Sequence, residues 1–302
     1  MKISNVIIIT GLLALSLVAN LVWADVPDVV NSPNVNNCDK RDELVDTVLK
    51  GHYEYVSCFS EGLARVSVYD DTSPNLSRFG FIDKTGRLVV PLKYDYARQF
   101  SEGVANVSLG DDSYFIDKID RVVIDVSEYD MVWDFHGGLV RISKNHPSGH
   151  PFKGMQGCLD KSGKVVIDVA YLELGCFADS NEEVALKYVN DDVKVGVINR
   201  QNQTVIDFDY AMLSPIDEQG LYVAIKDCSP FLAGFVSDEL LGYCRYGVID
   251  GRGGVVVDFN YQGLVFDDGV LIAKKDDKFG KITLGGDVIT PLVYDDVGDL
   301  PD

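Results

Sequence analysis

The sequence predicts an all-β repeat protein of about six units, each some 40 residues long and built from β-hairpins. Three patterns that recur in the same order support this fold class. Each unit has a short strand followed by a tight turn, then a β-branched apolar run, and then a tyrosine with an apolar residue five or six positions later. A supersecondary unit of this length cannot bury its own apolar face, so we expect successive units to stack.

The tight turn is the most regular element. The strand before it ends in an acidic, amide or hydroxyl residue at Asp83, Asp117, Asp160, Asn199, Asp250 and Thr283. Three positions later stand Gly86, Asp120, Gly163, Asn202, Gly253 and Gly286. Glycine, asparagine and aspartate are the residues that best tolerate a positive φ. The spacing therefore predicts a three-residue hairpin loop with a left-handed residue in every unit.

The run that follows the turn is apolar or β-branched at successive positions rather than at alternate ones. It covers 88–90, 122–124, 165–167, 204–206, 255–257 and 288–290. An uninterrupted apolar run is typical of a strand that is covered on both faces.

A tyrosine ends each unit, at Tyr94, Tyr129, Tyr171, Tyr210, Tyr261 and Tyr294. Six positions later come Phe100, Phe135, Phe177, Ile216 and Leu300, with Phe266 at five, and Tyr53 and Phe59 form the same pair upstream. The simplest interpretation of such a ladder is a stacked core.

The repeat covers one predicted domain, 38–302, with a half unit at 38–58 and full units from residue 59. Two architectures fit. The favoured one is an open, solenoid-like stack of hairpins, because tyrosine spacings of 33 to 51 residues tolerate insertions. The alternative is a six-bladed β-propeller.

Residues 53 to about 300 resemble the WG-repeat family of bacterial proteins, whose repeats are named for a Trp-Gly dipeptide, and the resemblance is strongest in 59–103. The segments FSEGLARV, FGFIDKTGRLVVPLKYD and FSEGVANV follow that pattern closely. No unit keeps the tryptophan, whose place is taken by Phe79, Ser113, Gln156, Val195, Tyr246 and Phe279. The glycine remains at Gly80, Gly157, Gly196, Gly247 and Gly280, but is Tyr114 in the second unit. The resemblance implies a divergent β-repeat domain with no catalytic residues.

The first 24 residues combine Lys2, an apolar run from Val6 to Val22, and Ala24 before Asp25. This pattern predicts a secretory signal peptide, 1–24, followed by an extended tether, 25–37, with a membrane anchor as the rival interpretation. We therefore expect export to the periplasm or the exterior, and no membrane span after cleavage. The net charge of −20 disfavours nucleic acid and favours a cationic partner or simple solubility.

Six cysteines, an even number in an exported chain, predict disulfides. The repeat register places Cys58 and Cys176 directly before an aromatic of the ladder, and Cys38 and Cys158 at matching upstream positions. We predict Cys38–Cys58, Cys158–Cys176 and Cys228–Cys244, the last closing the insertion of the fifth unit. A zinc site is the alternative, but no CxxC spacing supports it.

Four acidic pairs each follow the Gly-Leu-Ala-Val-type strand of their unit: Asp70-Asp71, Asp111-Asp112, Asp191-Asp192 and Asp276-Asp277. We expect them in equivalent hairpin loops along one edge. Turn preference and protection of strand edges explain them most simply. The functional alternative is a row of oxygen ligands for Ca²⁺ or for a basic partner.

No motif of nucleophilic, metal or phosphate chemistry occurs in the sequence. His146 and His150 lie in a Pro/Gly-containing loop, where a four-residue spacing does not favour a metal. We predict a non-enzymatic protein- or glycan-binding module or scaffold without a cofactor, with Trp133 and Tyr243 as candidate contacts. The alternatives are a carboxylate-dependent hydrolase on a propeller-like fold and a self-assembling structural module.

Overall fold

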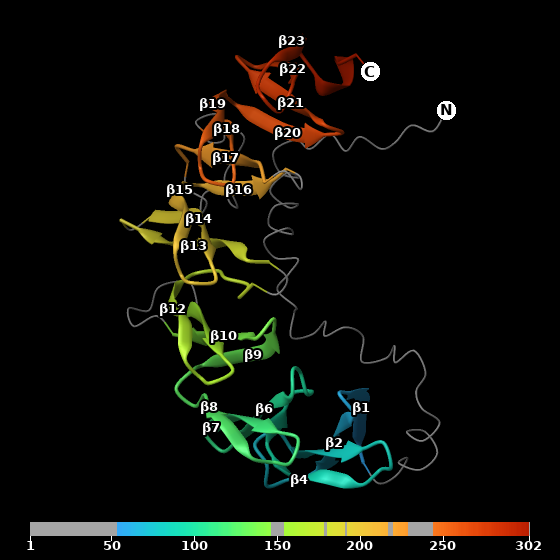
Figure 1. Cartoon of the computed structure of the whole chain (residues 1–302). Coiled ribbons are helices and arrows are strands. Elements are labelled where there is room, and N and C mark those ends of the chain that lie inside the picture. Colours follow the sequence, from blue (N-terminus) through green and yellow to red (C-terminus); the bar gives the residue numbers. More distant parts are fainter. Residues whose placement is uncertain are drawn as a thin grey trace, which may run out of the picture. The chain divides into compact units, whose positions relative to one another are not determined.

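The computed structural model describes residues 53–145, 154–177, 180–190, 192–216, 220–228 and 244–301 (Figure 1). The chain divides into two compact units at Asn181/Glu182. We call the described residues up to 181 the N-terminal unit and those from 182 the C-terminal unit, and each is described by itself. Each unit contains three β-sheets, numbered 1 to 6 in chain order.

The N-terminal unit holds three four-stranded antiparallel sheets, whose strands pair in chain order. Sheet 1 contains β1 (Tyr55–Ser60), β2 (Leu63–Tyr69), β3 (Ser77–Asp83) and β4 (Leu88–Tyr94). Sheet 2 contains β5 (Tyr96–Ala97), β6 (Val104–Leu109), β7 (Asp112–Asp117) and β8 (Val122–Asp125). Sheet 3 contains β9 (Met131–His136), β10 (Leu139–Lys144), β11 (Met155–Asp160) and β12 (Val165–Tyr171).

The C-terminal unit has one sheet of three strands and two of four. Sheet 4 contains β13 (Glu182–Val189), β14 (Asp192–Asn199) and β15 (Thr204–Tyr210). Sheet 5 contains β16 (Met212–Pro215), β17 (Tyr222–Lys226), β18 (Arg245–Ile249) and β19 (Val255–Tyr261). Sheet 6 contains β20 (Gly263–Asp267), β21 (Val270–Lys275), β22 (Lys278–Ile282) and β23 (Val288–Tyr294), and a 3₁₀ turn, η1 (Val297–Asp299), follows it.

The predicted all-β repeat fold is confirmed: six antiparallel sheets recur along the described part of the chain, and the strands of each pair in chain order. The choice between an open stack and a six-bladed propeller stays a prediction. So does the extent of the predicted domain, 38–302. The predicted signal peptide, 1–24, the tether, 25–37, and most of the half unit, 38–58, lie outside the described residues.

All six predicted left-handed turn residues have a positive φ, between 61° and 94°. The side-chain oxygen that ends the preceding strand holds each loop. Asp83 Oδ1, for example, accepts hydrogen bonds from the backbone N–H groups of Thr85 at 2.9 Å and Arg87 at 3.1 Å. Asn199 Oδ1 does the same with Gln201 and Gln203. This Asx geometry explains why the turn tolerates so few residue types.

We call the last strand of each sheet in chain order its outermost strand: β4, β8, β12, β15, β19 and β23. The glycine of the family dipeptide lies on the strand paired with it, where it meets the backbone of the outermost strand. A Cβ atom on Gly80, Gly157, Gly196, Gly247 or Gly280 would lie 2.6 to 2.8 Å from a carbonyl oxygen of that strand. Tyr114 occupies this position in sheet 2, and its outermost strand, β8, has only four residues, whereas the other five have seven. A side chain at this position therefore shortens the pairing.

The aromatic ladder joins neighbouring sheets inside the N-terminal unit. The rings of Phe81 and Phe100 lie 4.7 Å apart edge to face, and Phe115 and Phe135 repeat the contact at 4.9 Å. Phe177 is also buried. Phe266 in β20 is 37% exposed, so the prediction that the buried ladder includes Phe266 is wrong. The residue of sheet 5 that corresponds to Phe81 is Val248, and a valine covers less of a neighbouring ring than a phenylalanine does.

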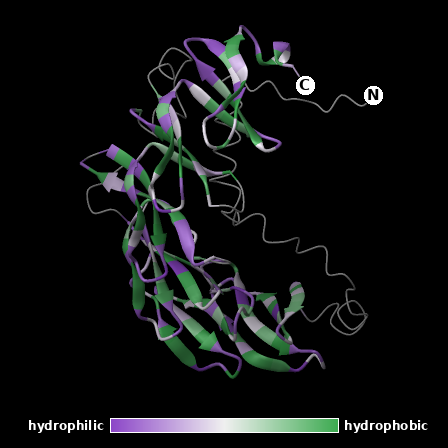
Figure 2. Cartoon of the chain, turned by 45° about the horizontal axis from the view of Figure 1, so that its top comes forward, coloured by the Kyte–Doolittle hydropathy of each residue, from purple (hydrophilic) through white to green (hydrophobic). Residues whose placement is uncertain are grey.

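The prediction that the outermost strands are covered on both faces is wrong. In β4 the burial pattern begins exposed, half-buried, buried, and β12 and β15 repeat it. Only the third residue of each run, such as Val90 or Ile167, enters the core. In Figure 2 green hydrophobic segments alternate with purple hydrophilic ones along the strands. The first three residues of each of these strands are therefore apolar or β-branched at successive positions, but only the third is buried.

Candidate interaction surface

Exposed aliphatic side chains recur at one register position of the outermost strands. We call the first residues of these strands the outer-strand row: Leu88, Val122 and Val165 in the N-terminal unit, and Val255 and Val288 in the C-terminal unit. They are between 39% and 59% exposed, and Val123, Val256 and Ile289 beside them are exposed as well. In the remaining outermost strand, β15, the position is Thr204. Repeated exposure of large aliphatic groups is typical of a surface that contacts another molecule.

The outermost strands carry a second feature that limits how they can be used. Their fourth residue is exposed, and it is a proline in β4 and β23 (Pro91 and Pro291) or an aspartate in the other four strands. A proline removes a backbone donor from a free edge, and a charged residue opposes pairing with another strand. The row therefore offers side chains rather than a backbone edge to a partner.

The turn Phe-Ser-Glu-Gly connects consecutive sheets of the N-terminal unit in a way that sequence reasoning missed. Ser60 Oγ donates to the Phe100 carbonyl oxygen at 2.6 Å, and Glu61 Oε2 accepts from the Gly103 N–H at 2.9 Å. Lys118 Nζ completes the contact, 3.1 Å from Glu61 Oε2 and 2.8 Å from the Glu61 carbonyl oxygen. We call this three-point contact the Ser-Glu joint.

A second Ser-Glu joint repeats the first between sheets 2 and 3. Ser101 Oγ donates to the Phe135 carbonyl oxygen at 2.7 Å, and Glu102 Oε2 accepts from the Gly138 N–H at 3.1 Å and from Lys161 Nζ at 3.0 Å. Burial by itself raises the pKa of Glu102. The hydrogen bonds from Lys161 and Gly138 outweigh that effect, so the pKa lies below its usual value.

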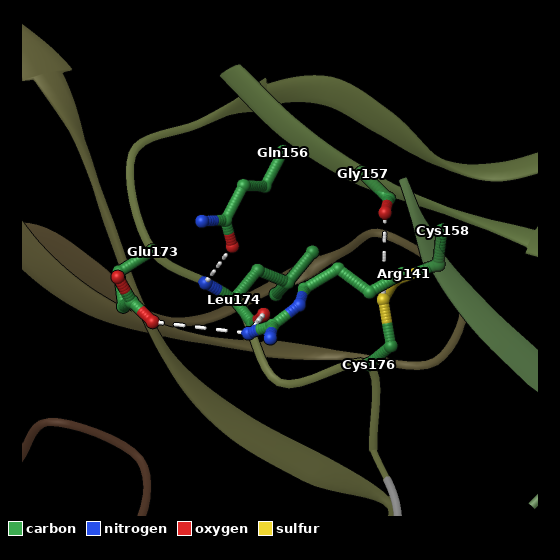
Figure 3. Close-up of a disulfide and its surroundings, with 7 residues drawn as sticks. All are labelled: Arg141, Gln156, Gly157, Cys158, Glu173, Leu174 and Cys176. Carbon is green, nitrogen blue, oxygen red and sulfur yellow. Dashed lines mark hydrogen bonds and ion pairs between the residues drawn. A yellow bond between two sulfur atoms is a disulfide. The ribbon is translucent and has the colours of Figure 1, made fainter. Parts of the chain in front are cut away.

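Arg141, in β10, is a buried cation that the sequence did not single out (Figure 3). Its side chain is 7% exposed, and its Nη1 atom donates to the Leu174 carbonyl oxygen at 3.1 Å and lies 3.9 Å from Glu173 Oε1. Its guanidinium lies 4.1 Å from the centroid of the Trp133 ring. Trp133 is therefore a half-buried partner of Arg141, while Tyr243, the other predicted contact, lies outside the described residues.

Sheet 1 contains the same arrangement. Arg65, in β2, donates from Nη1 to the Ala97 carbonyl oxygen at 2.6 Å and stacks on the rings of Tyr55 and Phe79. Phe79 and Gln156 occupy the position of the family's tryptophan, and Gln156 Oε1 accepts from the Leu174 N–H at 3.1 Å. In sheets 1 and 3 the tryptophan position thus lies beside a guanidinium that holds the chain segment leading to the next turn.

The structure pairs Cys158 with Cys176 and Cys228 with Cys244, as predicted. Cys58 is also disulfide-bonded, and its predicted partner, Cys38, lies outside the described residues. Cys176 Sγ lies 3.5 Å from the Gly157 carbonyl oxygen, a packing contact because a disulfide sulfur has no hydrogen (Figure 3). Cys176 and Phe177 both have a positive φ, so the bridge lies at an irregular segment.

The acidic pairs Asp70-Asp71 and Asp276-Asp277 lie in equivalent loops between the second and third strands of their sheets, as predicted, whereas in sheet 2 only Asp111 lies in that loop and Asp112 begins β7. Asp192 begins β14, and Asp191 lies outside the described residues. In the described part of the chain, no three carboxylate, histidine or cysteine groups come together as a metal site. The proposed Ca²⁺ row stays a prediction that the geometry does not strengthen.

Several of these carboxylates instead support their own loops. Hydrogen bonds from Thr72 and then Arg78 lower the pKa of Asp70 to about 2. Arg78 also contacts Asp95, whose pKa is lowered chiefly by the Gly110 N–H. Lys274 pairs with Asp277 at 3.3 Å. These contacts agree with a structural role for the acidic loops.

Sheets 5 and 6 border a shallow depression of about 230 Å³. The residues lining it include Asp258, Asn260, Tyr261 and Gly286, and Asp258 is its one carboxylate. A glycosidase-type site needs two carboxyl groups facing one substrate. His146 and His150 lie outside the described residues, and within those residues no helix is long and apolar enough to cross a membrane.

Comparison with solved structures returned matches of low similarity, some of which are described as β-propellers. The β-propeller domain of the Trilobed protease from Pyrococcus furiosus, described as having an open velcro topology, is 10% identical, with a TM-score of 0.31 over 79% of this chain and 80% of that one. The uncharacterized protein lmo1340 from Listeria monocytogenes EGD-e is also 10% identical, with a TM-score of 0.31 over 78% of this chain and 81% of that one. Likenesses this weak carry no argument about function.

A comparison with curated proteins found no match. A family model described as "WG containing repeat" matches residues 46–70, 79–111, 115–145, 196–227 and 246–279. These segments make up more than half of the chain and include strands of all six sheets. The chain belongs to the WG-repeat family.

Proposed function

We propose that this protein is an exported, non-enzymatic repeat module that binds a protein partner in the bacterial envelope or exterior. The observation that carries the proposal is the outer-strand row, in which large aliphatic side chains are exposed at the same register position of five outermost strands. Isolated exposed apolar residues need no explanation, but a repeated set does.

The chemistry of the row favours a protein over a glycan. Its members are leucine and valine, and isoleucine stands beside them at Ile289. Aliphatic groups gain free energy by burial against other apolar surface, at about 25 cal/mol per Å². Sugars are instead held through hydrogen bonds and aromatic stacking. The prolines and aspartates of the outermost strands oppose strand addition, so we expect side-chain packing as the mode of contact.

Export is supported by two features. The described residues contain two disulfides, and such bonds persist in oxidising compartments. The first 24 residues have the pattern of a cleaved leader. N-terminal sequencing of the protein recovered from outside the cytoplasm tests this part, and we expect the chain to begin at Asp25.

The binding role is tested by capture from envelope and secreted fractions of the source organism, with residues 25–302 as bait at moderate salt. The test variant carries Val255→Ser, Val288→Ser and Ile289→Ser. The matched control carries Tyr69→Ser, Leu109→Ser and Val265→Ser, three side chains that are equally exposed but lie outside the outermost strands.

A partner retained by the control and lost by the test variant supports the proposal. A partner that both variants retain, or that disappears only when the salt is raised, points away from the row and toward the charged loops, since exposed charge contacts are screened beyond about 8 Å at physiological ionic strength. Recovery of no partner contradicts the binding role.

A further inference from the structure

Sheet 1 contains the three groups that contact a Ser-Glu turn in the two joints, but no Ser-Glu turn among the described residues contacts them. In both complete joints the receiving groups are the same: the carbonyl oxygen of the ladder phenylalanine, the N–H of the turn glycine and a lysine that follows the strand-ending aspartate. Sheet 1 has all three, as Phe59, Gly62 and Lys84.

The register shows that these groups are placed as in the occupied joints. Leu63 pairs with Asp83 in sheet 1, just as Val104 pairs with Asp117 in sheet 2, so the glycine and the lysine hold the same relation across the two strands. Ser60 pairs with Leu63 around the turn, and the neighbouring Phe59 carbonyl therefore points away from β2.

Within the described residues, neither the Gly62 N–H nor the Lys84 ammonium has a partner, and Lys84 is exposed. Gly62 has φ +90°, and a Cβ built on it would have no atom within 4 Å. Gly103, which receives Glu61, has φ +91° and the same open space at its Cβ position. The backbone of the first turn is thus already in the conformation that binds a carboxylate.

We propose that Phe59, Gly62 and Lys84 form a docking site for a Ser-Glu hairpin turn supplied by another protein. The serine hydroxyl donates to the Phe59 carbonyl, and the glutamate carboxylate accepts from the Gly62 N–H and from Lys84. The two internal joints supply the template, since their corresponding distances agree within 0.2 Å. Charge-assisted hydrogen bonds of this kind are the stronger ones in proteins.

A second copy of this chain does not match the site. Its two Ser-Glu turns are engaged internally, and its last equivalent turn is Phe266-Asp267-Asp268-Gly269. That turn has the right backbone, with φ of 43° at Asp268 and 85° at Gly269. However, Asp267 stands in place of the serine, and an ionised carboxylate cannot donate to the Phe59 carbonyl.

The test uses amide NMR signals that the sequence makes easy to isolate. Only two glycines follow a glutamate, Gly62 and Gly103. Labelling glutamate with carbonyl ¹³C and glycine with ¹⁵N therefore selects two signals of residues 25–302, one from the vacant joint and one from the occupied joint. The probe is a cyclised hairpin peptide with the turn Phe-Ser-Glu-Gly. The control peptides carry Phe-Ser-Gln-Gly and Phe-Asp-Asp-Gly.

On titration with the Ser-Glu peptide we expect the Gly62 signal to move toward the position of Gly103, while Gly103 stays fixed. Both control peptides should bind about tenfold more weakly, and so should the Ser-Glu peptide to the Lys84→Met variant. A Gly62 signal that does not move, or equal affinity for the glutamate and glutamine peptides, would overturn the proposal. So would a Gly62 signal that shifts in Lys84→Met without peptide, since the chain itself would then occupy the site.

Discussion

The two units contain the same kind of sheet, but different contacts connect consecutive sheets in each of them. In the N-terminal unit, guanidinium groups of Arg65 and Arg141 reach backbone carbonyls, and two Ser-Glu joints link consecutive sheets. At the positions of Arg65 and Arg141 the C-terminal unit has Val184, Val223 and Ile272. Its sheets meet through apolar clusters, such as that of Leu264, Leu271 and Ile282 with Val248 and Val257.

This difference separates what the repeat fold requires from what it permits. Both units keep the left-handed turns, and every sheet except sheet 2 keeps the close approach at the family glycine. The joints between sheets vary because apolar packing tolerates exchange of similar volumes, whereas a hydrogen-bonded joint requires particular atoms. We therefore expect the N-terminal unit to be the more sensitive of the two to single polar substitutions.

The largest effect is expected from the disulfide of the N-terminal unit. Cys158→Ser with Cys176→Ser should lower the free energy of unfolding of this unit by about 3 kcal/mol, because the bridge closes a loop of 18 residues. Trp133 is the only tryptophan of residues 25–302, so its fluorescence during denaturant unfolding follows this unit alone. Cys228→Ser with Cys244→Ser, of nearly equal span, is the control. An equal shift of the Trp133 transition in the control would show that the units do not unfold separately.

The next effect concerns the buried guanidinium. Arg141→Met should cost about 2 kcal/mol of unfolding free energy, because it leaves the Leu174 carbonyl without its donor. Ile272→Met, at the corresponding position of sheet 6, should cost less than about 1.5 kcal/mol as a volume-conserving change. Urea unfolding followed by circular dichroism measures both. Similar losses of unfolding free energy in the two variants would show that the Arg141 hydrogen bond does not stabilise the fold more than apolar packing does.

A smaller effect is expected at the second Ser-Glu joint. Glu102→Gln keeps an oxygen for the Gly138 N–H but loses the charge that faces Lys161, so we expect a loss of about 1 kcal/mol. Hydrogen exchange at Gly138 should become faster. Asp268→Asn, at the matching turn of sheet 6, should leave exchange in the C-terminal unit unchanged. The interpretation of Glu102 as a joint fails if Gly138 exchanges at the same rate in the variant.

The smallest expected effect is a difference between the two units in their stability at low pH. The strand-ending residues are Asp83, Asp117 and Asp160 in the N-terminal unit, but Asn199, Asp250 and Thr283 in the other. Hydrogen bonds from Thr85 lower the pKa of Asp83 to about 2, and the pKa values of the other three aspartates are lowered as well. A carboxyl whose folded pKa is lowered stabilises the fold above its unfolded pKa, and this contribution is lost as the pH falls from about 4 to about 2.

Amide hydrogen exchange can be measured by mass spectrometry of peptides from both units between pH 5 and pH 2. As the pH falls, the amides of the N-terminal unit should lose more protection than those of the C-terminal unit. Asp83→Asn, which mimics Asn199, should reduce that loss. If the variant and the parent lose protection equally, the turn aspartates do not cause the acid response.

The features that sequence reasoning predicted are those fixed within a few residues. The six turn positions followed from the rarity of residues that accept a positive φ, and they are all confirmed. The two disulfides followed from the repeat register, and the structure contains both. Local chemistry determines such features, so the chain shows them directly.

The errors and omissions concern relations between sheets. The apolar runs at 88–90 and 255–257 predicted burial on both faces, because a run of valines does not reveal that its strand is outermost. The Ser-Glu joints were missed although their signal is present: Phe-Ser-Glu-Gly recurs at 59–62 and 100–103, and a lysine follows Asp83, Asp117 and Asp160. A glutamate and a lysine that recur together, one unit apart, indicate a contact between units.

The Cys228–Cys244 bridge has a consequence for engineering. The Cα atoms of its cysteines lie 5.1 Å apart, and the bridge joins a point just after β17 to a point just before β18. The end of β17 and the start of β18 are therefore held together whatever sequence connects the two cysteines. A guest peptide grafted there would be displayed as a closed loop from a scaffold whose strand pairing it does not enter.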